Sequence, residues 1–413
     1  MKCLLPMVCL LILSSIVSAE DWPQWRGVNR DGISLEKGLL KTWPNKLPLR
    51  WKVVEIGVGY ASPAIVKGSV FLQTTRGDKE IAIAFDEKTG QERWSTEIGT
   101  VGVNRGPQYP GTRSTPTVDG DHVYCLASAG QLVCVKVANG QAVWSKHLQK
   151  DFDGVVGNWA YSESPLVDGG LVICTPGGKE AALAAFKKGT GELVWKTAIP
   201  GGDRAEYASI VRASDGKRSQ YVQFLGKGIV GVDAKSGALL WKYAKTASVA
   251  NIATPIVSGS RVFTSGSRSG GALVQLKPAA NGTEAIEVYH RPGLGASIGG
   301  AVLVGDKLFG TTRQAAFCAD FVSGRTKWAK RAGGAASISY ADGRLYMRFH
   351  KSGDVALVEA NADSYREVGR MQQDDRSGTA AWPHPVIANG GLYLRDQGTL
   401  LCYDIADRER ASK

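Results

Sequence analysis

The chain has 413 residues, of which 51 are glycine, and a formal net charge of +12. Short apolar segments punctuated by glycine occur throughout, and no long amphipathic helical window is present, so an all-β architecture is indicated. The basic residues are scattered, with no Lys/Arg run longer than two, which argues against a nucleic-acid partner. A basic surface of this kind could still attract anionic polymers.

The first nineteen residues resemble a secretory signal. Lys2 provides a positive start, residues 4–17 are apolar, and small residues at Val17 and Ala19 precede a cleavage point before Glu20. The stretch is too short for a spanning helix, and a retained anchor is the alternative. Cys9 lies inside the apolar stretch and not at the cleavage point, so lipid attachment is not predicted. We therefore expect a periplasmic or secreted protein that does not span a membrane.

Residues 20–48 form a leader that precedes the first repeated segment. It contains three tryptophans, Trp22, Trp25 and Trp43. Exposing rings of this size to water is costly. We expect the leader to pack on the folded domain.

An eleven-residue unit that ends in Trp recurs along the chain. Its copies are AFDEKTGQERW (84–94), CVKVANGQAVW (134–144), AFKKGTGELVW (185–195), GVDAKSGALLW (231–241) and CADFVSGRTKW (318–328). Each copy has Gly at its seventh position, which predicts a tight turn between two strands. The spacing between Trp241 and Trp328 is about two periods, and a degenerate copy of the unit that ends at Tyr289 lies between them. The constant place of the ring in every copy suits packing between neighbouring units, and a row of ligand-stacking platforms is the alternative.

A second pattern precedes each unit and has an apolar strand, a glycine turn and an apolar-aromatic pair. Four copies begin with Ser/Thr-Pro, as in SPAIVKGSVF (62–71) and TPTVDGDHVY (115–124). Eight such hairpins occur, including one with an insertion at 208–224, and the period is about 49 residues. Each period therefore provides four short strands, which is the composition of a propeller blade.

The two ends of the repeated region complement each other. The chain stops after LLCYDI (400–405), one strand short of a full blade, and LRWKVV (49–54) stands before the first hairpin. We predict that residues 49–405 form a single eight-bladed propeller, closed by the N-terminal strand in the last blade, with a charged tail at 406–413. Closure leaves no open sheet edge, and a monomer is expected. Seven blades plus an edge hairpin is the competing interpretation, and it discounts the worn copy around 337–369.

Five cysteines remain after removal of the predicted signal, and each lies in an apolar run, so buried thiols are expected. If Ala129-Gly130 were a two-residue hairpin loop, Cys125 and Cys134 would lie opposite each other, and a disulfide is an alternative to two packed thiols. The five histidines and the cysteines show no metal-ligand spacing. No metal site built on them is expected.

The repeated unit resembles the hallmark A-x-D-x-x-[TS]-G-x-x-x-W of the pyrroloquinoline-quinone (PQQ)-like β-propeller superfamily. The opening DWPQWRGVNRDG (21–32) is similar to the leader of an exported subgroup. The superfamily contains quinoprotein alcohol dehydrogenases, outer-membrane assembly propellers and exported propellers of unassigned role. The resemblance implies a fold and leaves the function open.

The central channel of a propeller is lined by the segments just before the inner strands. Several of these segments carry polar or aromatic residues beyond what a turn needs, namely Arg113, Trp159, Tyr161, Glu163, Asp203, Arg204, Tyr207, Asn251, Trp382 and His384. If these side chains converge on one face, they suit a flat, anionic or sugar-like ligand through stacking and bidentate hydrogen bonds. The alternative is that they hold the blade tops together.

The resemblance also raises a catalytic alternative. Quinoprotein dehydrogenases hold Ca²⁺ beside PQQ with a Glu and an Asn from different blades, and Glu163 and Asn251 occupy positions that could imitate them. Ser297 stands where the general base would be wanted, and the adjacent Cys-Cys pair of those enzymes is missing. No catalytic residues are assigned and no cofactor is expected in the main interpretation.

The sequence therefore favours an exported, non-catalytic propeller that acts as a binding or scaffold protein for an envelope protein or polymer. A PQQ- and Ca²⁺-dependent dehydrogenase is the alternative, and a polysaccharide-binding propeller is the third interpretation. The outer-membrane assembly propellers are the nearest functional analogy that the resemblance offers.

Overall fold

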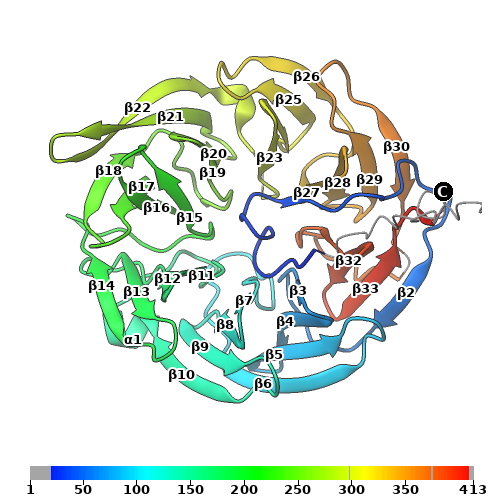
Figure 1. The fold of residues 1–413 in the computed structure, drawn as a ribbon, viewed down its shortest axis with the longest axis horizontal. Coiled ribbons are helices and arrows are strands. Elements are labelled where there is room, and N and C mark those ends of the chain that lie inside the picture. The colour runs from blue at the N-terminus through cyan, green and yellow to red at the C-terminus, as the bar shows by residue number, and fades with distance from the viewer. Residues whose placement is uncertain (1–19, 297, 374, 409–413) are drawn as a thin grey trace, which may run out of the picture.

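The computed structural model of the chain describes residues 20–296, 298–373 and 375–408. The predicted signal peptide and Ser297 lie outside these ranges. The described residues form eight small sheets that radiate from a common centre (Figure 1), and their strands are antiparallel except for one short strand added to the seventh sheet. The predicted all-β, eight-bladed propeller is confirmed.

The first four blades follow one another along the chain. Their strands are β3 (Ala64–Val66), β4 (Ser69–Arg76), β5 (Lys79–Asp86) and β6 (Glu92–Thr100); β7 (Thr117–Asp119), β8 (His122–Leu126), β9 (Gln131–Lys136) and β10 (Ala142–His147); β11 (Leu166–Asp168), β12 (Leu171–Cys174), β13 (Leu183–Lys187) and β14 (Leu193–Thr197); β15 (Val211–Ser214), β16 (Ser219–Leu225), β17 (Gly228–Asp233) and β18 (Leu239–Tyr243). The short helix α1 (Leu148–Phe152) follows the second blade.

The next three blades continue the pattern. Their strands are β19 (Ile256–Ser258), β20 (Arg261–Gly266), β21 (Gly270–Ala279) and β22 (Gly282–Arg291); β23 (Ala301–Val304), β24 (Lys307–Thr311), β25 (Ala316–Asp320) and β26 (Thr326–Lys330); β27 (Ala336–Ala341), β28 (Arg344–Phe349), β29 (Val355–Glu359) and β30 (Glu367–Met371). A 3₁₀ turn at Pro292–Leu294 follows the fifth blade. None of the helices in the described ranges is long and apolar enough to cross a membrane.

The eighth blade is built from both ends of the chain. Strands β31 (Val386–Ala388), β32 (Gly391–Asp396) and β33 (Thr399–Asp404) are completed by β2 (Leu49–Val53), which pairs antiparallel with β33. The blue β2 and the red β33 lie side by side in Figure 1. The predicted closure by the N-terminal strand is therefore confirmed, and the ring has no unpaired end.

The repeated Gly and Trp hold neighbouring blades together. Gly140 has φ +71°, and a Cβ placed on it would lie 2.5 Å from the indole of Trp94 in the preceding blade. That indole also donates from Nε1 to the carbonyl of Val137 (2.8 Å). The glycine therefore provides both the left-handed turn and the space for the ring. The same contact recurs between Trp51 and Gly90, Trp144 and Gly191, and Trp195 and Gly237.

The degenerate copies of the repeat form the same blade structure with different residues. In the fifth blade Tyr289 replaces Trp, packs on Gly324 of the next blade and donates its hydroxyl to the carbonyl of Phe321 (2.9 Å). Strands β27 to β30 form a complete sheet in the region of the weakest repeat. The seven-blade interpretation is therefore wrong, because the weak repeat there still carries four paired strands.

The five cysteines of the described chain are buried and free. Cys125 pairs with Val133, and Cys134 pairs with Tyr124. The geometry that would have placed Cys125 opposite Cys134 does not occur, because Ala127 and Gln131 close a three-residue loop and shift the register by one. The two thiols consequently point to opposite faces of the blade and belong to separate hydrophobic clusters.

The leader folds back onto the propeller and reaches its centre. Its strand β1 (Ile33–Ser34) pairs in parallel with β27, Trp22 bridges to Ile65 in β3, and Trp43 packs against Tyr346 with ring centroids 5.9 Å apart. In Figure 1 the blue leader runs across the middle of the ring. It therefore joins blades that are far apart in the sequence.

Candidate functional site

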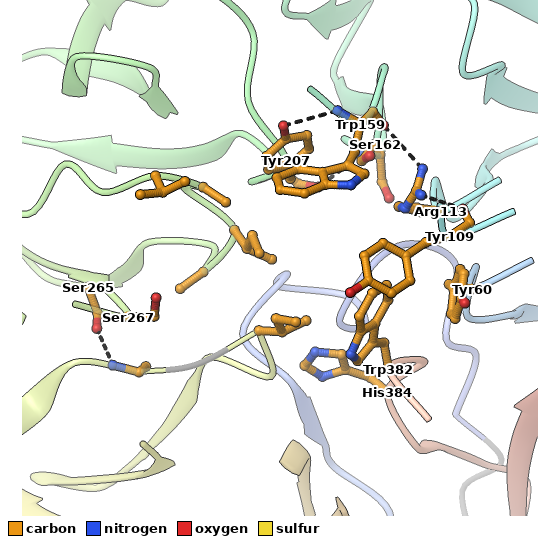
Figure 2. A pocket seen from close by; sticks show the side chains of 18 of the residues that line it. Tyr60, Tyr109, Arg113, Trp159, Ser162, Tyr207, Ser265, Ser267, Trp382 and His384 are labelled. Carbon is orange, nitrogen blue, oxygen red and sulfur yellow. Dashed lines mark hydrogen bonds between the residues drawn. The ribbon is translucent and has the colours of Figure 1, made fainter. Parts of the chain in front are cut away.

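A cavity of about 590 Å³ lies at the centre of the ring. Its walls come from the leader, from the connections that enter the inner strands, and from two hairpin tips (Figure 2). This volume falls within the range of small-molecule sites. Val249, Arg268 and Arg313 are exposed and mark the mouth, whereas Tyr60, Ser164 and His384 are buried behind the surface.

Serine hydroxyls join the starts of neighbouring inner strands around the cavity. Backbone N–H groups donate to the Oγ atom of the adjacent blade from Thr115 to Ser164, from Ser164 to Ser209, and from His384 to Ser62, each over 2.9 Å. These are the residues before proline in the repeat, or their equivalents. Proline favours an extended conformation in the residue before it. In this structure the N–H of that residue is directed at the neighbouring blade. These positions of the repeat therefore join neighbouring inner strands around the cavity.

The leader contributes Trp25 to the cavity. Its Nε1 donates to Thr254 Oγ1 (2.9 Å), and its ring meets that of His384 edge-on at 4.8 Å. The flanking arginines anchor the leader: Arg26 donates to the carbonyl of Ala301 (2.6 Å), and Arg30 donates to that of Ser164 (2.7 Å). Burial lowers the pKa of Arg26 to about 10 and that of Arg30 to about 9, so both stay charged at neutral pH.

Aromatic rings form two groups on the cavity wall. In the first, Trp382 lies 4.7 Å from Tyr60 and 4.7 Å from Tyr109, with interplanar angles of 37° and 62°. In the second, Trp159 and Tyr207 are 5.7 Å apart at 63°. Figure 2 shows both groups facing the same hollow. Because the rings within a group are tilted, each group presents both ring faces and ring edges to the cavity.

Arg113 lies between the two aromatic groups. It donates to the carbonyl of Trp159 (3.1 Å) and to that of Tyr109 (2.6 Å), and its guanidinium carbon is 5.9 Å from the ring centroid of Tyr60. Burial lowers its pKa, while Tyr60 and the nearby Glu80 oppose that shift. Arginine remains charged in proteins. Two of its five N–H donors are used by these carbonyls, which leaves others for a ligand.

The charge that faces the cavity is positive. Arg113, Arg268 and Arg313 line it, and no Asp or Glu is among its lining residues in the described chain. Arg268 and Arg313 take part in no ion pair within the described ranges. His384 adds no charge, because burial and Arg26 hold its pKa well below its usual value. The site therefore favours an anion.

One hydroxyl in the wall lacks a partner. Ser162 is 8% exposed and lines the cavity, and its Oγ has no hydrogen-bond partner in the described structure. Buried hydroxyls almost always have a partner. An incoming polar group would satisfy it.

The cavity brings together half of the predicted site residues. Those that line it are Arg113, Trp159, Tyr207, Trp382 and His384. The others do not line it: Tyr161, Glu163 and Asn251 are buried, Asp203 is half-buried and Arg204 is exposed. Tyr161 donates to the carbonyl of Pro176 (2.7 Å). Asp203 accepts from the backbone of Lys227 (3.0 Å), and Arg204 pairs with Glu206 (2.6 Å).

Glu163 and Asn251 are engaged inside the wall. Glu163 accepts from the N–H and hydroxyl of Thr175 and from Gln223 Nε2 (2.9 Å), and burial raises its pKa to about 7. The Oδ1 of Asn251 accepts from the N–H of Ser248 (2.8 Å), and its Nδ2 donates to the carbonyl of Leu225 (2.7 Å). Both side chains therefore have their hydrogen-bond partners within the wall.

These residues do not fit calcium bound beside a quinone. Ca²⁺ takes six to eight oxygens and favours carboxylates, whereas the cavity wall presents arginines. The described chain holds no group of three or more His, Cys, Asp or Glu that could bind a metal. Glu80 in the first blade has a matching role: it accepts from Ser128 of the second blade, and its pKa is likewise raised to about 7. Glu163 thus belongs to a recurring kind of carboxyl that ties blades together.

Several cavity residues were not predicted. Tyr60 and Tyr109 stand in the connections before Ser62-Pro63 and Thr115-Pro116, so the rule that selects Trp159 also applies to them. The sequence predicts only a packing role for Trp25. Arg268 and Arg313 are at hairpin tips, outside the connections that enter the inner strands.

Comparison with known proteins places the chain in a family. The family model described as outer membrane protein assembly factor BamB matches residues 77–330. The chain belongs to this family. The BamB-like repeats are thus PQQ-like propeller repeats, as the sequence resemblance implied.

Solved structures share the fold of this BamB-like chain at low identity. BamB from Moraxella catarrhalis is 15% identical with a TM-score of 0.59, and the match covers 87% of this chain and 98% of that one. Quinohemoprotein alcohol dehydrogenase from Comamonas testosteroni is 13% identical with a TM-score of 0.64, covering 94% and 80%. A europium-containing methanol dehydrogenase is 11% identical with a TM-score of 0.64, covering 92% and 90%. A search of curated proteins found no match.

Proposed function

We propose that the protein is an exported, non-catalytic propeller that binds an envelope protein or polymer. The observation that carries this proposal is the composition of the central cavity. Aromatic rings and arginines face it, while the nearby carboxyls of Glu80 and Glu163 are engaged in the wall. Such a surface can hold a ligand by stacking and charge.

The chemistry of proton transfer supports binding over catalysis. A general base must reach the proton that it removes and have a pKa near the working pH. Glu163 has a suitable pKa, but Thr175 and Gln223 occupy its oxygens away from the cavity. His384 lines the cavity, yet its Nδ1–H donates to the carbonyl of Ile338 (3.2 Å), and the low pKa keeps it a poor base.

Export rests on the sequence of residues 1–19, and the family match agrees with an envelope protein. Cell fractionation followed by N-terminal sequencing tests this part. The expected result is a protein in the envelope or periplasmic fraction that begins near Glu20. A full-length chain in the cytoplasmic fraction would overturn it.

Titration of the mature protein with PQQ and Ca²⁺ tests the non-catalytic part. Tryptophan fluorescence, thermal melting and reduction of an artificial electron acceptor in the presence of an alcohol are the readouts. We expect no calcium-dependent change and no reduction. A saturable, calcium-dependent effect that disappears in Glu163→Gln and Asn251→Ala, together with dye reduction, would establish the dehydrogenase alternative instead.

A further inference from the structure

We propose that the central cavity binds an acidic sugar unit of an envelope glycan, an assignment that rests on the proposed binding function. The wall supplies aromatic faces for the apolar side of a sugar ring and guanidinium groups for its carboxylate. Trp159 and Trp382 provide the faces, and Arg113 lies between them. The cavity is closed around by the inner strands and open at a mouth marked by exposed residues, so a chain end could enter.

The sign of the ligand follows from the lining. Three arginines line the cavity with no carboxylate partner among the described residues, so they create a positive potential there, and low-dielectric walls strengthen it. The planar fork of Arg113 is suited to carboxylate recognition, because parallel N–H groups match the two oxygens. A neutral sugar would leave this charge uncompensated.

The shape of the wall favours a puckered ring. The rings within each aromatic group are tilted by 37° to 63°, so neither group presents a single flat surface to a planar polycyclic acid. A sugar also offers hydroxyls along its edge. The unpaired Oγ of Ser162 can exchange a hydrogen bond with such a hydroxyl.

Location supports a glycan over a free metabolite. The chain has a formal net charge of +12 and is predicted to be exported, so it would meet acidic envelope polymers at a basic surface. The two mouth residues Arg268 and Arg313 are exposed, and neither forms an ion pair in the described ranges. They are placed to attract the neighbouring acidic units of a polymer.

Calorimetric titration of the mature chain with trigalacturonate tests the proposal, with galactotriose as the neutral control and 1-naphthoate as a flat aromatic acid. We expect saturable binding of trigalacturonate that is at least tenfold tighter than that of the other two. Binding should weaken as NaCl rises from about 50 to 500 mM, because salt screens exposed charges. Equal affinity for the neutral sugar, tighter binding of the aromatic acid, or no binding would overturn the proposal.

The double variant Arg268→Gln/Arg313→Gln locates the site without disturbing the core, because both side chains are exposed. Each exposed charge contributes up to about fivefold in affinity, so a loss of roughly tenfold is expected. Arg325→Gln removes another exposed arginine, which lies in the hairpin between β25 and β26 and does not line the cavity, and should leave affinity unchanged. An equal loss in both variants would overturn the site assignment.

Trp382→Ala provides a second test, with melting temperature measured to confirm folding. It should abolish most of the binding in a protein that still melts cooperatively. The PQQ and calcium titration separates the two levels of the argument. Calcium-dependent PQQ binding with dye reduction would overturn the proposed function, whereas failure of the sugar with no PQQ effect would overturn the ligand assignment alone.

Discussion

Replacement of Gly140 by Ala tests how the blades are held together. Gly140 has φ +71°, and a Cβ there would lie 2.4 Å from Thr96 Oγ1 and 2.5 Å from the ring of Trp94. The left-handed conformation costs Ala about 1 kcal/mol or slightly more. Crowding of a packed interface adds roughly 1–3 kcal/mol. The free energy of unfolding should therefore fall by about 2–4 kcal/mol.

Gly120→Ala is the matched control. Gly120 also has positive φ, +56°, but a Cβ placed there would have no neighbour within 4 Å, so only the conformational cost of about 1 kcal/mol applies. Urea denaturation followed by circular dichroism measures both variants, and equal slopes would show that only stability has changed. If Gly140→Ala cost no more than Gly120→Ala, the packing of Trp94 on the glycine would not stabilise the interface, and the reasoning would be refuted.

Three further predictions follow from buried polar groups. Burial raises the pKa of Glu80 and Glu163 from 4.5 to about 7, so the folded state binds protons more tightly. The stabilisation of the folded state by these two carboxyls is full below about pH 4.5 and is lost as pH rises through 7, by roughly 3 kcal/mol for each. Urea titrations of Glu80→Gln/Glu163→Gln should show an unfolding free energy that depends less on pH than that of the wild type. An unchanged pH dependence would contradict this. Arg30→Met leaves the carbonyls of Ser164 and Pro165 without that donor and should lower the unfolding free energy by about 1–3 kcal/mol; limited proteolysis should then release residues 20–48 faster, and wild-type cutting rates would contradict the anchoring role. The five buried thiols should react with a disulfide reagent only as denaturant unfolds the protein, and fast labelling of the native protein would contradict their burial.

The fold could be predicted because its local signals and long-range contacts coincide. The glycine of each eleven-residue unit marks a turn in the sequence, and the same glycine accepts the Trp of the preceding blade, or Tyr289 in the case of Gly324. A motif that performs both tasks persists in every strong copy. Tyr289 shows that the Trp of the unit can be replaced, since a smaller ring with a hydroxyl still reaches the neighbouring blade.

The site could be predicted only in part. The repeat shows which segments enter the inner strands, but it does not show in which direction each side chain of those segments points. Trp159 and Trp382 enter the cavity from segments just before inner strands, as expected. Glu163 comes from a similar segment but turns into the wall, where Thr175 and Gln223 supply donors. Those donors lie 12 and 60 residues further along the chain, so no local pattern reveals them.

The direction of these buried carboxyls decides what the centre of the molecule can bind. Glu80 and Glu163 use their oxygens for hydrogen bonds within the wall, and burial raises the pKa of each to about 7, so each carries less negative charge near neutral pH than an exposed carboxylate does. Arg113 also bonds to the wall, but to neutral carbonyls, so its positive charge is not cancelled. The polar network that joins the blades therefore keeps these two carboxyls out of the cavity, whereas Arg113 contributes its positive charge there. The proposal of an anionic ligand at the centre therefore rests on the way in which the blades are joined.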